Sequence, residues 1–249
     1  MTVSPLKIQK VFPDGSHEEK EILSLNEHRL AIIINGRQIF SLVCTDSNLM
    51  ELVAGRLLTS GIIDKKEDIA DIRFCESKAR AFVTLKEEVV WEESQTPEAS
   101  CCTKNKEFAQ NADQAPLPLL QKRDCPSEWI FALAKEFSKD SAIHTHTAGT
   151  HSCILAQKGK AIFSAEDIGR HNALDKAIGY MLLNDIPAQK ALLFTSGRVP
   201  VDMVEKVIRA GVGILISKSV PTAQSAVLAR EHNLTLICRA WPDSFELVE

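Results

Sequence analysis

Apolar and polar positions alternate in short runs through the first third of the chain, a pattern that predicts β-strands. Strands are expected over residues 31–34 and 38–43, joined by Asn35-Gly36, because this pair readily adopts the positive φ angles of a tight hairpin turn. A second pair of strands is expected over 69–75 and 79–85. This part of the chain therefore predicts a sheet, and it shows no cluster of catalytic residue types.

One helix interrupts these predicted strands. Asn48 and Glu51 have the spacing of a capping box, which predicts that the helix begins here. Gly61 marks its end. The apolar stripe of this helix consists of Leu49, Leu52, Val53 and Leu57. We expect the helix to pack this stripe against the sheet.

The apolar periodicity stops between residues 92 and 118, after one more short strand expected over 89–91. Polar residues and prolines dominate this segment, so we expect a mobile loop that links two parts of the protein. Cys101 and Cys102 lie in its middle. Free cysteines are usually buried, so a pair in a polar segment indicates reactive thiols. Two incidental thiols in a loop would give the same pattern.

Helical and strand patterns alternate after residue 127, which predicts parallel strands joined by helices. The first of these helices carries Ile130, Phe131, Ala134 and Phe137 on its apolar face. A hairpin is expected over 153–163, with its turn at Lys158-Gly159. The remaining strands are expected over 191–195, 212–217 and 234–238, and the helices between them over 202–210 and 222–231.

Composition fits a globular α/β protein. The chain has 249 residues, of which 45% are hydrophobic, enough to bury a sizeable core. We divide it into a smaller, strand-rich α+β domain over 1–115 and an α/β domain over 116–249. The formal net charge of −4 argues against a nucleic-acid-binding scaffold. Seven cysteines form no disulfide framework and no membrane or signal segment is visible, so we expect a cytoplasmic protein with reduced thiols and no membrane partner.

The densest group of ionisable residues lies between 166 and 176, where a predicted strand meets an apolar helical run. Asn172 and Asp175 have the spacing of a second capping box. Gly169 points to a backbone conformation or a close approach that a Cβ would hinder. A reactive site and a capped helix with surface ion pairs explain this pattern equally well, so periodicity alone leaves both interpretations open.

Two further segments lie where a predicted strand meets a helix, the place at which open parallel sheets collect ligands. The first, residues 195–198, combines loop amides, a hydroxyl and a forked guanidinium, and these groups suit phosphate. Asp202 and Glu205 are expected to cap the helix that follows. The second segment, 219–222, is explained by Thr222 as a helix cap. We expect both turns on the same edge of the sheet.

Three histidines, His144, His146 and His151, lie within eight residues and raise the alternative of a zinc site, since a His-x-His pair on a strand suits zinc. Zinc deaminases carry a His-x-Glu element followed by Pro-Cys-x-x-Cys. No Cys-x-x-Cys occurs in the sequence, and the only His-x-Glu lies at residues 17–19. We therefore expect no bound metal.

Several segments resemble the FdhD family, whose members supply sulfur for active formate dehydrogenase. Residues 166–179, EDIGRHNALDKAIG, look like the family signature, and 196–198 look like its Ser-Gly-Arg element. Residues 147–151 are similar to its Thr-Gly-Gly-x-His box, with alanine in place of one glycine. Residues 219–222 are similar to its Ser-x-Pro-Thr element, and 245–248 to its final strand.

The cysteine pair stands where this family has Ser-Cys-Gly-x-Cys-Gly. Cys101 aligns with the cysteine that carries sulfur as a persulfide, Cys102 takes the place of a glycine, and Lys104 takes the place of the second cysteine. The resemblance thus assigns the catalytic role to Cys101, with Cys102 as a candidate to replace the missing thiol.

The resemblance implies a cytidine-deaminase-like, three-layer α/β domain. It also implies a homodimeric sulfurtransferase that accepts sulfur from a cysteine desulfurase. The sulfur would go to the molybdenum of a bis(molybdopterin guanine dinucleotide) cofactor before insertion into formate dehydrogenase. The cofactor contacts it implies are Thr147, Gly149, His151, Glu166, Asp167, Gly169, Arg170, His171, Asn172, Asp175, Lys176, Ser196, Gly197, Arg198, Pro221, Thr222, Phe245, Glu246, Leu247 and Val248.

Within this set, Arg170 and Arg198 are expected to contact phosphate, and His171 to exchange a proton with the leaving thiol. Two alternatives remain. One is a chaperone that binds the cofactor and leaves sulfur transfer to another protein, and the other is a zinc-dependent hydrolase of the deaminase kind.

Overall fold

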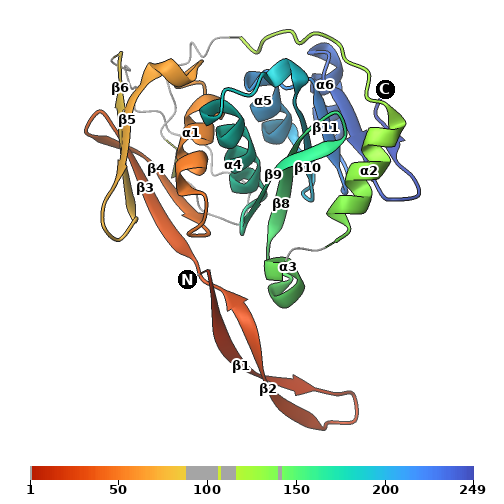
Figure 1. Cartoon of the computed structure of the whole chain (residues 1–249). Coiled ribbons are helices and arrows are strands. Elements are labelled where there is room, and N and C mark those ends of the chain that lie inside the picture. Colours follow the sequence, from red (N-terminus) through yellow and green to blue (C-terminus); the bar gives the residue numbers. More distant parts are fainter. Residues whose placement is uncertain (1, 88–105, 108–115, 140–141) are drawn as a thin grey trace.

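In the part of the chain that the structure describes, the strands form three sheets, two of which pack on a group of helices (Figure 1). The structure is a computed structural model that describes residues 2–87, 106–107, 116–139 and 142–249. The strands are β1 (Val3–Val11), β2 (His17–Leu25), β3 (His28–Ile34), β4 (Arg37–Cys44), β5 (Ile69–Phe74), β6 (Arg80–Leu85), β7 (Lys106–Glu107), β8 (His151–Gln157), β9 (Lys160–Asp167), β10 (Leu192–Thr195), β11 (Ile214–Ser217), β12 (Thr235–Cys238) and β13 (Glu246–Leu247). The α-helices are α1 (Leu49–Thr59), α2 (Ser127–Phe137), α3 (Ala142–Thr147), α4 (Arg170–Leu183), α5 (Val201–Arg209) and α6 (Ala223–Glu231). The predicted mixed α/β fold is confirmed.

The five-stranded sheet has the order β5-β6-β3-β4-β7. Its centre is the predicted β3-β4 hairpin, and the turn residues Asn35 and Gly36 have φ angles of 46° and 85°, as a tight hairpin turn requires. β5 and β6 form the second predicted pair, and β6 lies parallel to β3. The strand predicted over 89–91 lies outside the described residues.

The six-stranded sheet has the order β13-β12-β11-β10-β8-β9. β8 and β9 form the predicted hairpin, whose turn residues Lys158 and Gly159 have φ angles of 49° and 72°. β10, β11 and β12 are parallel, as the alternation of strands and helices predicts. β13 pairs antiparallel with β12 at one edge.

Helices pack on both faces of the six-stranded sheet. Leu155 and Leu193 face a core that also contains residues of α1, α4, α5, α6 and the five-stranded sheet. Ile154 and Phe194 face the opposite way and pack with α2. Figure 1 accordingly shows α1 and α4 between the two sheets and α2 on the far side. One core thus joins the two halves of the chain, and the division at residue 115 stays a prediction.

α1 and α4 cross at very short distance because both have glycine at the crossing. A Cβ added to Gly55 would lie 1.8 Å from the carbonyl oxygen of Asp175, and one added to Gly179 would lie 1.8 Å from that of Glu51. Both distances are far below van der Waals contact, so only glycine fits at either position. This packing explains the last glycine of the signature stretch.

Of the four predicted helix caps, the three capping boxes are wrong. Asn48 precedes α1 in the left-handed conformation without a side-chain cap, and α5 begins after Pro200, not at Asp202. α4 begins after Gly169, so Asn172 lies inside its first turn. The prediction for α6 is confirmed, since the Thr222 hydroxyl accepts the backbone N–H of Ser225.

The sequence pattern did not predict the ribbon formed by β1 and β2, because most of its side chains are exposed and polar. It projects away from the rest of the molecule in Figure 1. At its base, a Cβ on Gly149 would lie 2.9 Å from Leu25 Cδ1, so the loop after α3 packs directly on β2. Across the described residues, no helix is long and apolar enough to cross a bilayer.

Candidate functional site

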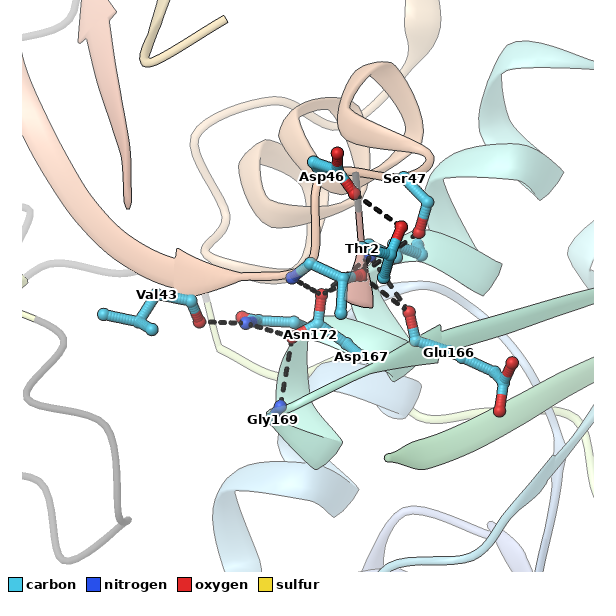
Figure 2. A network of polar contacts seen from close by, with 10 residues as sticks. Thr2, Val43, Asp46, Ser47, Glu166, Asp167, Gly169 and Asn172 are labelled. Carbon is cyan, nitrogen blue, oxygen red and sulfur yellow. Dashed lines mark hydrogen bonds and ion pairs between the residues drawn. The ribbon is translucent and has the colours of Figure 1, made fainter. Parts of the chain in front are cut away.

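The signature stretch begins with a buried ion pair. Lys176 Nζ lies 2.7 Å from Asp167 Oδ2, and both side chains are fully buried. The backbone N–H of Thr45 donates to the same carboxylate oxygen over 3.0 Å, and the lysine donates to the Thr45 hydroxyl over 2.7 Å. Asn172 links the other carboxylate oxygen, 2.9 Å away, to the Val43 carbonyl, 2.8 Å away. As Figure 2 shows, this network ties β9 and α4 to the end of β4.

A second buried network surrounds Asp175 one turn further along α4. Lys206 Nζ lies 2.8 Å from both carboxylate oxygens, and the Thr59 hydroxyl donates to one of them over 2.8 Å. Arg56 Nη1 lies 3.5 Å from the other. These groups join α1, α4 and α5 inside the core. Asp167, Asn172, Asp175 and Lys176 are therefore closed to solvent. They hold together the helices that present the site, and their predicted contacts with the cofactor stay predictions.

Arg170 at the start of α4 packs over the turn after β10. A Cβ on Gly197 would lie 2.8 Å from Arg170 Cβ and 3.0 Å from its Cδ, so the glycine makes room for the arginine. Arg198, the next residue, is exposed. Arg170 Nε is buried without a hydrogen-bond partner, and no ion pair joins either arginine to a carboxylate within the described ranges. Two arginines that form no ion pair among the described residues thus lie at the carboxyl end of β10.

His151 and Ser196 extend this group. His151 Nδ1 lies 3.3 Å from the Ser196 hydroxyl, which also accepts the backbone N–H of Ser152 over 3.0 Å. Burial lowers the pKa of His151, and the positive charges of Arg170, His171, His144 and Arg198 lower it further. We call His151, Arg170, His171, Ser196 and Arg198 the basic rim.

His171 is the rim residue with a defined acidic partner. Its Nε2 lies 2.7 Å from Asp202 Oδ2, and its side chain is 9% exposed while that of Asp202 is 53% exposed. Burial raises the pKa of Asp202, but the close contact and charge of His171, together with the charge of Arg170, outweigh burial and lower it. The histidine and the carboxylate therefore form a charged or strongly polar pair at the edge of the rim.

The turn at 219–222 lies beside the rim, as predicted. Val199 forms a parallel bridge with Pro221, and the Ser217 hydroxyl donates to the Gly197 carbonyl over 2.7 Å. The segment 245–248 lies further away, because β11 and β12 separate β13 from β10. Contacts of both segments with the cofactor stay predictions.

Two other predicted residues, Glu166 and Thr147, border the site. The Thr150 hydroxyl donates to Glu166 Oε1 over 3.0 Å, which holds the glutamate at the ends of β8 and β9. Thr147 ends α3 and donates to the Ile143 carbonyl over 2.8 Å. Gly149 packs on β2, as described above, and so contributes to the base of the ribbon.

A pocket of about 560 Å³ adjoins the rim on the α2 face of the sheet. It shares Ser196 and Thr150 with the site, and Phe137 and Ile154 supply an apolar wall. Lys218, on the same lining, lies 5.4 Å from the Phe137 ring centroid and 5.0 Å from that of Trp241. Sequence reasoning did not select Lys218, because neither motif nor spacing marks it.

The predicted catalytic thiols, Cys101 and Cys102, lie outside the described residues. Five other cysteines are described, and none forms a disulfide. Burial raises the pKa of Cys44 and of Cys238 to about 12 and that of Cys125 to about 11, and it raises the pKa of Cys153 as well. These thiols are poor nucleophiles. Cys75 differs, since a hydrogen bond with Ser77 lowers its pKa.

The histidine segment lacks the strand geometry that would suit a His-x-His zinc pair. His144 and His146 lie on α3 and only His151 lies on a strand. His144 Nδ1 contacts the Thr150 carbonyl at 3.1 Å. Within the described chain, no three His, Cys, Asp or Glu side chains are grouped closely enough to hold a metal ion. The described residues therefore offer the zinc alternative no group of ligands.

Comparison with known proteins points to one family. The model of the FdhD/NarQ family matches residues 25–248. The "Sulfur carrier protein FdhD" of Halalkalibacterium halodurans is 35% identical over 226 residues, covering 88% of this chain and 83% of that protein. The protein of the same name from Bacillus pumilus is 33% identical over 250 residues, covering 99% and 95%.

A solved structure is similar over nearly the whole chain. It is the crystal structure of a protein described as a formate dehydrogenase accessory protein, from Desulfotalea psychrophila. The two structures have a TM-score of 0.79 at 27% sequence identity, and the match covers 99% of this chain and 96% of the other.

Proposed function

Because this chain belongs to the FdhD/NarQ family, we propose that it carries sulfur from a cysteine desulfurase to the molybdenum cofactor of formate dehydrogenase. Cys101 holds the sulfur as a persulfide, and the basic rim holds the bis(molybdopterin guanine dinucleotide) before its insertion. The observation that carries the proposal is the pair of arginines at the carboxyl end of β10, Arg170 and Arg198, which form no ion pair among the described residues.

The rim residues suit the phosphates of a dinucleotide. Guanidinium groups bind phosphate oxygens through paired, charge-assisted hydrogen bonds. The buried, unpaired Nε of Arg170 is a donor that a bound anion would satisfy. Because Gly197 has no Cβ, the turn leaves space for the Arg170 side chain to lie across it. An acidic protein thus gains a local site for an anionic ligand.

The sulfur chemistry needs a thiolate that can reach a donor. The Cys101 thiolate attacks the outer sulfur of the desulfurase persulfide, so a new S–S bond forms, the old one breaks and its electron pair leaves with the donor thiolate. The outer sulfur then passes to molybdenum, which supplies the electron pair of the new bond, and the Cys101 thiolate is restored. His171 exchanges the proton of the thiol at the rim.

The remaining parts of the proposal rest on the family alone. They are a cytoplasmic location, a homodimer, and a cytidine-deaminase-like arrangement of the six-stranded sheet and its helices. The helices on both faces of that sheet are compatible with a three-layer fold.

Arg198→Gln tests the rim directly, with guanosine diphosphate as the probe in titration calorimetry. Losing a charge-assisted hydrogen bond of about 1.5–3 kcal/mol should weaken binding tenfold or more. Arg230→Gln is the matched control, because Arg230 is also exposed but lies near the end of α6. Equal affinity of wild type and Arg198→Gln for guanosine diphosphate would contradict the proposal that the basic rim binds the cofactor.

A double variant, Cys101→Ser with Cys102→Ser, separates a carrier from a chaperone. A strain that depends on this protein for formate dehydrogenase activity should lose that activity when only the double variant is supplied. Full activity would show that the protein binds the cofactor while another protein moves the sulfur.

A further inference from the structure

A row of polar side chains crosses the end of the six-stranded sheet on the face that packs with α2. Ile154, Phe194 and Ile216 point to this face and belong to the core beneath α2. Because strand side chains alternate between the two faces, the residues two positions nearer the basic rim share it. These residues line the pocket of about 560 Å³ that adjoins the rim, and they are Ser152, Ser196 and Lys218.

Lys218 is the cation of this row, and its ammonium group has no hydrogen-bond or ion-pair partner in the described part of the chain. The side chain is half-buried, with Nζ 5.4 Å from the Phe137 ring centroid and 5.0 Å from the Trp241 ring centroid. The two aromatic rings stabilise the positive charge, but they leave three N–H donors without an oxygen or nitrogen acceptor. A ligand in the pocket can supply these acceptors.

We propose that Lys218 is a specificity-determining residue, which recognises the 6-oxo edge of a purine nucleotide bound in this pocket. The inference rests on the proposed function, in which the basic rim holds the phosphates of the same ligand. Ser196 belongs both to the rim and to the pocket lining. Lys218 lies beside it, because the Lys218 backbone N–H donates to the Thr195 carbonyl over 3.0 Å. A nucleotide can therefore place its phosphates at the rim and its base in the pocket.

The chemistry of Lys218 favours one kind of purine. Guanine presents two acceptors, O6 and N7, on one edge, whereas adenine has an amino group in place of O6. An ammonium group only donates hydrogen bonds, so it can bind O6 and N7 together but lies donor against donor with the amino group of adenine. Phe137 and Ile154 form an apolar wall of the pocket, which suits the flat face of either base.

Titration calorimetry of the full chain with three nucleoside diphosphates tests this assignment. Wild type should bind guanosine and inosine diphosphate with similar affinity, because both bases carry O6 and N7. It should bind adenosine diphosphate about tenfold more weakly. Equal affinity for guanosine and adenosine diphosphate would overturn the inference. An affinity for inosine diphosphate as low as that for adenosine diphosphate would also overturn it, since the 2-amino group would then be the group recognised.

Lys218→Met removes the ammonium group and keeps a side chain of similar length beside the two rings. This variant should lose about tenfold in affinity for guanosine diphosphate and little for adenosine diphosphate, so the preference should disappear. Lys160→Met is the matched control, because Lys160 is exposed at the end of β9 that lies away from the rim. It should keep the wild-type preference. A preference that survives in Lys218→Met would contradict the role of Lys218.

The inference and the proposed function can fail separately. Arg198→Gln should weaken the binding of all three diphosphates alike, because the rim binds their phosphates. If that holds and the base preference does not depend on Lys218, only the inference fails. If Cys101 takes up no sulfur from a desulfurase, the proposed function fails, while the base preference still decides the role of Lys218. Binding of none of the three diphosphates by wild type would contradict both the pocket and the rim.

Discussion

At the scale of residues, the signature stretch divides into a buried structural part and a part that borders the basic rim. Asp167, Asn172, Asp175 and Lys176 are buried in two polar networks. Their partners come from α1, α5 and the end of β4, more than thirty residues away in most cases. Sequence reasoning could find the cluster of charges but not its burial, because those partners become neighbours only in the folded chain.

Lys176→Met should destabilise the protein strongly. The substitution keeps the length of the side chain but leaves Asp167 as a buried charge without its cation, which typically costs about 3–5 kcal/mol. Chemical denaturation followed by circular dichroism measures the free energy of unfolding. Lys66→Met is the control, because its ion pair with Asp185 is 39% and 69% exposed and should matter by about 1 kcal/mol or less. Equal losses in both variants would contradict the structural role of the buried pair.

At the scale of elements, helices and strands were largely predictable and their ends were not. The two hairpins and the three parallel strands follow from apolar periodicity and from the Asn35-Gly36 and Lys158-Gly159 turns. The capping boxes at Asn48 and Asp202 failed because their side chains do not cap the helices beside them. Helix starts depend on tertiary partners that local spacing does not contain.

The crossing of α1 and α4 is the element contact that sequence could not reveal, since no local rule distinguishes Gly179 from a helix-weakening glycine. Gly179→Ala should lower stability although alanine is the better helix former by about 1 kcal/mol. The new Cβ would meet the Glu51 backbone at 1.8 Å, and overpacking of this kind costs about 1–3 kcal/mol or more.

Thermal unfolding of Gly179→Ala provides the measurement, with Gly213→Ala as the control. A Cβ on Gly213 would meet Arg123 Cδ at 2.9 Å, and that flexible side chain can move. We expect a clearly larger fall in the midpoint temperature for Gly179→Ala. A midpoint at or above that of wild type would show that the helices do not need this close approach.

At the scale of the whole molecule, one core connects the five-stranded sheet, the helices and the six-stranded sheet. The networks around Asp167 and Asp175 lie in the same region, so the elements that carry the basic rim are anchored to both sheets. The rim itself combines segments that are distant in sequence, from His151 to Arg198. The motifs indicated each segment, whereas their assembly and the partnership of His171 with Asp202 required the fold.

Sulfur transfer by this protein depends on the carrier thiol, and the other cysteines are the thiols with which Cys101 would compete for sulfur. Cys44, Cys125, Cys153 and Cys238 have raised pKa values because they are buried, so they should not compete for sulfur at neutral pH. Cys75, whose pKa is lowered, is the competitor to exclude. The test therefore compares wild type with Cys75→Ser, Cys101→Ser and Cys102→Ser.

The most direct measurement is intact-mass spectrometry after incubation with a cysteine desulfurase and cysteine, followed by peptide mapping. We predict a gain of one sulfur atom, located on Cys101, that persists in Cys75→Ser and disappears in Cys101→Ser. A gain that survives in Cys101→Ser, or no gain while the thiols remain reduced, would contradict the carrier mechanism.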